Sequence, residues 1–124
     1  MDQGTLVRNG RRLLELLTEN KLAPRAAVWV SSPETGIWRL WIVPSKDLKD
    51  KHEFYRRTSE IISKNRVDFP DFEISDIEFV SESHPAILAL KRFAKVTGGS
   101  TVQIQSSMVD GFYLPDCIVL EMNL

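Results

Sequence analysis

The sequence predicts a single α+β domain over residues 1–124, with three helices and a mixed sheet of five or six strands. Apolar residues recur at helical spacing in three segments and alternate or run together in the segments between them. The resulting order is α-β-β-α-β-α-β-β(-β), which implies hairpins and crossover connections in one sheet. A length of 124 residues and a hydrophobic content of 43% suit one modest core.

The first predicted helix covers residues 5–20. Its inward stripe combines five apolar or small residues at helical spacing, namely Leu6, Gly10, Leu13, Leu14 and Leu17. Pro24 follows, and its ring disfavours helical geometry at the residue before it. We therefore expect the helix to end before this proline.

A β-hairpin is predicted next, from residues 27–30 and 37–43. The intervening residues 31–36 are rich in residue types that form turns. The second strand is apolar at both sets of alternating positions, so both of its faces need cover. One face carries Trp38, Leu40 and Ile42, and the other carries Ile37, Arg39, Trp41 and Val43.

A second helix is predicted from a cap at Ser45 or Asp47 to about residue 65. Residues 72–79 then alternate between apolar and acidic side chains. The alternation slips by one position at Ser75 and Asp76, which predicts a strand with a β-bulge.

The third predicted helix has its cap at Ser81 or Ser83 and Pro85 in its first turn, and Gly98-Gly99 ends it. Residues 101–105 and 117–122 follow as predicted strands. Between them, Asp110-Gly111 indicates a tight turn.

Composition excludes several classes of protein. No apolar run approaches the roughly 18 residues that cross a bilayer. The first residues lack the basic segment and hydrophobic core of a secretory signal, so we expect a cytoplasmic protein without membrane contact. The lone Cys117 has apolar neighbours, which favours a packed thiol over a nucleophile.

Charge is distributed unevenly, although the net charge is only −1. Residues 1–66 hold 13 basic and 8 acidic residues, and residues 67–124 hold 3 and 9. An acidic partner, a basic partner or pairing between the two halves would each explain this, and we favour pairing. A basic patch at Arg8, Arg11 and Arg12 could bind the phosphates of a nucleic acid. The sequence contains no nucleic-acid-binding motif, so we expect no nucleic-acid partner.

Candidates for chemistry are few. Asp71, Glu73, Asp76 and Glu78 form an acidic row that could dock a basic partner or hold a metal, but it lacks the glycine of a cation-binding loop. His52 and His84 have no partners at zinc-ligand spacing. We therefore predict no metal or cofactor. The alternative is a metal-dependent or nucleic-acid-processing enzyme that uses this row or Asp116 and Glu121.

The predicted strand over residues 37–43, which is apolar on both faces, indicates association with another chain. Two helices on one sheet face and one on the other would cover it, whereas three on one side would leave Trp41 exposed as a partner site. Tryptophan is favoured at the centres of such contacts. The alternative is that Trp29, Trp38 and Trp41 are all core residues. The sequence thus favours a non-enzymatic interaction or regulatory module, a homodimer or a partner of another protein, with an interface at Trp29, Ile37, Arg39, Trp41 and Val43.

Overall fold

A computed structural model of the chain describes residues 2–48, 50–93, 101–109 and 111–124. It confirms the predicted class and order of elements. The predicted helix end at Gly98-Gly99 and Asp110 of the predicted turn lie outside the described residues. The helices are α1 (Gln3–Glu19), α2 (Lys51–Lys64) and α3 (Pro85–Phe93), with short 3₁₀ turns at Arg66–Asp68 and Ile74–Asp76. The strands are β1 (Ala26–Ser31), β2 (Trp38–Val43), β3 (Ile77–Phe79), β4 (Val102–Ile104), β5 (Ser107–Val109), β6 (Phe112–Leu114) and β7 (Cys117–Met122).

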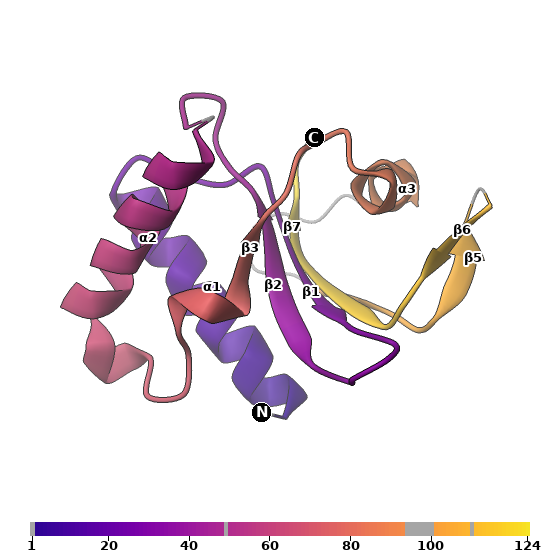
Figure 1. The fold of residues 1–124 in the computed structure, drawn as a ribbon, viewed down its shortest axis with the longest axis horizontal. Coiled ribbons are helices and arrows are strands. Elements are labelled where there is room, and N and C mark those ends of the chain that lie inside the picture. The colour runs from indigo at the N-terminus through magenta and orange to yellow at the C-terminus, as the bar shows by residue number, and fades with distance from the viewer. Residues whose placement is uncertain (1, 49, 94–100, 110) are drawn as a thin grey trace.

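Five strands form one sheet in the order β3-β2-β1-β7-β4, and β5 and β6 form a separate two-stranded ribbon. β1 and β2 make the predicted antiparallel hairpin, in which Trp29 lies opposite Leu40. β2 and β3 are parallel, while β7 is antiparallel to both β1 and β4. Figure 1 shows α1 and α2 on one side of this sheet, and α3 with the β5-β6 ribbon on the other.

The face beneath α1 and α2 carries the larger core. Trp29, Leu40 and Ile42 from the sheet are fully buried there together with Leu13 and Phe54 from the helices. The indole Nε1 of Trp29 donates a hydrogen bond of 2.7 Å to the carbonyl oxygen of Leu6. α1 is thus joined to β1 by a buried polar contact as well as by packing.

The opposite face packs against α3 and the ribbon. Val28, Val43 and Val119 of the sheet are buried with Ile87 of α3 and Leu114 of β6. The sheet therefore has apolar side chains on both faces, as the sequence of residues 37–43 predicts, and the arrangement is two helices on one side and one on the other.

Three local predictions were wrong. α2 begins after Asp50, whose side chain accepts a hydrogen bond from the backbone of His52, and not after Ser45 or Asp47. The cap of α3 is neither Ser81 nor Ser83. Pro85 has no backbone N–H, and the N–H of Ala86, the first in the helix, donates its hydrogen bond to His84 Nδ1. These serines hydrogen-bond to each other instead.

The third wrong prediction is the bulged strand over residues 72–79. Only Ile77–Phe79 is extended and paired, and the slip at Ser75 and Asp76 falls in a 3₁₀ turn. Glu73 and Asp76 cap this turn reciprocally through their side chains and backbones. Phe72 is buried in the core from a loop, which mimics the alternation of a strand.

Candidate interaction surface

An apolar groove of about 340 Å³ opens on the sheet face that carries α3. Its lining includes Trp41 on β2, the end of the β1-β2 hairpin and the chain at the end of β6. We call it the Trp41 groove, and its lining comprises Val30, Ser31, Ser32, Pro33, Ile37, Arg39, Trp41, Glu78, Tyr113 and Pro115.

Trp41 is only partly buried, because α3 does not cover the whole of this sheet face. The expectation that two helices on one face and one on the other would cover β2 is therefore wrong at Trp41. Its ring meets the ring of His84 edge to face, with centroids 4.9 Å apart and an interplanar angle of 62°. His84 Nδ1 in turn accepts a hydrogen bond of 3.1 Å from the backbone N–H of Ala86. The start of α3 therefore fixes one side of Trp41 and leaves the other side to the groove.

The rim of the groove exposes large apolar side chains. Ile37 is 60% exposed and Tyr113 is 47% exposed. Met108 of β5, which is 65% exposed, pairs directly with Tyr113 in the ribbon, so the two side chains share one face. Clustered apolar exposure of this kind is typical of a surface that contacts a partner.

Two charged side chains lie on the same surface. Glu78 on β3 is the register partner of Trp41, and Arg39 lies two residues before Trp41 on β2. Both line the groove. Within the described part of the chain, neither the Arg39 nor the Glu78 side chain has a hydrogen bond or an ion pair.

The remaining residues of the predicted interface lie inside the chain. Trp29 is fully buried against α1, where its ring also meets Phe72 at a centroid distance of 5.8 Å. Val43 is buried against α3. Neither side chain could contact a partner in the folded chain, so the candidate surface keeps Ile37, Arg39 and Trp41.

Tyr113 and Pro115 are groove residues that the sequence reading missed. They belong to the segment after Gly111, where the sequence indicates a turn but not the direction in which the chain continues. The alternation of Phe112, Tyr113 and Leu114 is too short to predict that this ribbon folds over the sheet. No local signal could have found them.

The acidic row does not converge on a site. Glu73 and Asp76 cap the 3₁₀ turn between α2 and β3, and Glu73 also pairs with Arg66 at 3.4 Å. Asp71 is exposed in a loop. Glu78 is on the sheet face that carries α3, where it lines the Trp41 groove. Among the described residues, no group of three His, Cys, Asp or Glu side chains is placed to hold a metal ion.

The other acidic pair, Asp116 and Glu121, is also used within the fold. Asp116 Oδ1 accepts hydrogen bonds from the backbone and hydroxyl of Ser106 at 2.8 and 2.9 Å. Partial burial raises the pKa of Glu121, and the charge of Arg11 opposes that rise. The hydrogen bonds of Asp116 thus join the residue before β7 to the segment between β4 and β5.

Two of the three arginines of the predicted basic patch have structural contacts. Arg11 donates a hydrogen bond of 2.9 Å to the carbonyl oxygen of Leu120, and Arg12 pairs with Asp68 at 3.1 Å. Arg8 is exposed on the same helix. Arg11 thus joins α1 to β7, and Arg12 joins α1 to the 3₁₀ turn after α2.

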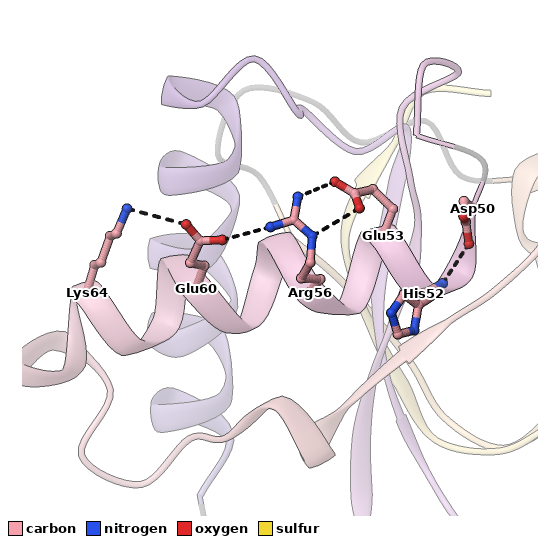
Figure 2. A network of polar contacts seen from close by, with 6 residues as sticks. All are labelled: Asp50, His52, Glu53, Arg56, Glu60 and Lys64. Atoms are coloured by element: carbon pink, nitrogen blue, oxygen red, sulfur yellow. Dashed lines mark hydrogen bonds and ion pairs between the residues drawn. The ribbon is translucent and has the colours of Figure 1, made fainter.

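The charges of α2 form a ladder along its exposed side, shown in Figure 2. Arg56 pairs with Glu53 one turn before it and with Glu60 one turn after it, and Glu60 also pairs with Lys64. The hydrogen bond from Arg56 lowers the pKa of Glu53. The backbone N–H of His52 donates a hydrogen bond to the Asp50 side chain at the start of the helix. This network stabilises the exposed surface of the helix. Glu60 and Lys64 also line a pocket of about 180 Å³ that reaches Asn20 at the end of α1.

Comparisons of the chain with protein-family models, curated proteins and solved structures found no match. Among the described helices, none combines the length and the apolar character needed to cross a membrane.

Proposed function

We propose that this chain is a non-enzymatic protein-interaction module that forms a homodimer through the Trp41 groove. The observation that carries the proposal is the gathering of exposed apolar side chains around a partly buried tryptophan. A contact that covers Ile37, Tyr113 and Met108 would remove apolar area from water, which favours association. Tryptophan and tyrosine at the centre add large, rigid contact surfaces.

The distribution of the polar groups also supports binding over catalysis. Among the described residues that line the groove, the polar side chains are Arg39, Glu78, two serines and Tyr113, with no histidine, cysteine or second carboxylate. General acid–base or nucleophilic chemistry needs a paired donor and acceptor within hydrogen-bond reach of a substrate. The lining suits recognition of an apolar surface with a few polar contacts.

Sedimentation velocity across a concentration series tests this proposal. We expect the wild-type protein to dimerise and Ile37→Lys to remain monomeric, because the change places a charge on the rim without disturbing the core. Val67→Lys is the matched control, since Val67 is 92% exposed and lies after α2, outside the groove. It should dimerise like the wild type.

Circular dichroism would verify that both variants keep the fold. A wild-type protein that stays monomeric at its highest soluble concentration would contradict the proposal. So would equal dimerisation of the wild type and Ile37→Lys.

A further inference from the structure

We infer that the two copies recognise each other through reciprocal ion pairs, in which Arg39 of each copy binds Glu78 of the other. This inference rests on the proposed dimer and adds its orientation and the residues that determine its specificity. It starts from the two charges that flank Trp41 in the groove.

Their positions follow from the sheet register. Glu78 lies directly across from Trp41 on the neighbouring strand, and Arg39 is on the face of Trp41 because it lies two residues away along β2. Trp41 therefore has a cation along its own strand and an anion on the adjacent strand. Glu78 is half-buried, while Arg39 is exposed.

Both side chains lack a partner within the described residues, unlike Arg12, Arg25 and Arg56, which all form ion pairs. A partner surface that covered the groove would take Arg39 and Glu78 out of water. If either charge stayed unpaired in the contact, the free-energy cost of removing it from water would exceed the gain from one ion pair at the edge of the interface. The occupant must therefore supply one anion and one cation.

A second copy of this chain meets that requirement by symmetry. A two-fold interface brings the same patch from both chains together, so each residue contact occurs twice. With the axis near Trp41, the cation of one copy faces the anion of the other at both ends. A purely acidic or purely basic peptide would satisfy one charge and repel the other.

Charge reversal tests the inference in the full chain. Arg39→Glu alone places two acids at each end of the interface, and Glu78→Arg alone places two arginines there. Each variant should dimerise about tenfold more weakly than the wild type, or worse. An equimolar mixture of the two should form a heterodimer of near wild-type affinity, because both reciprocal pairs are then restored.

The double variant Arg39→Glu with Glu78→Arg should also dimerise, since its pairs are merely exchanged. Arg8→Glu and Glu19→Arg carry the same changes of net charge on exposed positions of α1, across the sheet from the groove. They should dimerise like the wild type. Thermal unfolding of each variant would show whether a variant that does not dimerise is still folded.

The outcomes separate the inference from the proposed function. If both single variants dimerise normally, or if their mixture shows no preference for the heterodimer while Ile37→Lys is monomeric, the reciprocal pairing is wrong and the groove dimer stands. If the wild type is monomeric, both fail. Rescue in the mixture cannot arise from a contact within one chain.

Discussion

Gly10 lies on α1 where the helix packs against β1 and β7. A Cβ at this position would lie 2.3 Å from Leu120 Cδ1 and 2.9 Å from Trp29 Nε1, and both side chains are fully buried. Alanine is the better helix former, but here it would force the helix away from the sheet. The spacing of the apolar residues places Gly10 on the inward stripe, although only the structure shows what it contacts.

We expect Gly10→Ala to lower the free energy of unfolding by roughly 1–3 kcal/mol. Gly4→Ala is the control, because its Cβ would meet only Asp2 Oδ1 at 3.5 Å and helix propensity should make it neutral or slightly stabilising. Urea denaturation measures both. A Gly10→Ala protein as stable as the wild type would show that α1 does not approach the sheet as described.

We expect ionisation of the Cys117 thiol to lower the free energy of unfolding at high pH. Burial, with a smaller contribution from the charge of Asp116, raises the pKa of this thiol from 9.0 to about 11. The unfolded thiol ionises first, so its stabilising contribution is present below pH 9 and is lost as the pH rises toward 11. The expected decline is roughly 1 kcal/mol per pH unit over that interval.

Comparison with Cys117→Ala isolates this contribution, since other groups titrate in the same range in both proteins. Urea denaturation at pH 8 to 11 should show a steeper decline for the wild type. Parallel declines would contradict a buried, neutral thiol.

At the scale of elements, the outer edge of β3 is covered by one side chain of α2. Tyr55 Oη accepts a hydrogen bond of 2.9 Å from the backbone N–H of Phe79 and lies 3.5 Å from the carbonyl oxygen of Ile77. β3 ends the sheet, and an open strand edge invites pairing with another chain. The phenol thus occupies the edge that a further strand would use.

We expect Tyr55→Phe to cost about 1 kcal/mol of stability and to accelerate hydrogen exchange at the amide of Phe79. Ser63→Ala is the control, because it removes a hydroxyl from an exposed position of the same helix, away from the edge of β3. Mass spectrometry with fragment resolution, or NMR, would measure the exchange. Unchanged exchange at Phe79 in Tyr55→Phe would mean that the hydroxyl does not protect this edge.

Sequence patterns predicted the longer elements well and the short connections poorly. The hairpin and α1 follow from strong periodicity and from turn residues that local chemistry favours. The start of α2 was wrong because Ser45, Asp47 and Asp50 are equally good caps by residue type. The bulge was wrong because Phe72 is buried from a loop, and burial alone cannot distinguish a loop from a strand.

At the scale of the whole molecule, ion pairs join the basic first half to the acidic second half. Arg12 pairs with Asp68 at 3.1 Å, and Arg25 pairs with Glu82 at 2.9 Å. The favoured interpretation of the uneven charge therefore has structural support. Exposed pairs of this kind contribute little individually, so we assign them a role in charge balance rather than in holding the fold.

The candidate surface could be predicted only in part. Alternation along residues 37–43 correctly places Ile37, Arg39 and Trp41 on one face, because side-chain direction is a local property of a strand. The extent of cover is a global property. It depends on where α3 lies over the sheet and on how the β5-β6 ribbon folds back, and neither is encoded in a short pattern.

Association through the Trp41 groove can be followed by the indole N–H signal of each tryptophan in ¹⁵N NMR spectra recorded over a dilution series. We expect the Trp41 signal to move with concentration as the groove is covered. The Trp29 signal should stay fixed, because its indole N–H is bound to Leu6 inside one chain. A Trp41 signal that is constant over the whole series, or that moves only together with Trp29, would contradict association through the Trp41 groove.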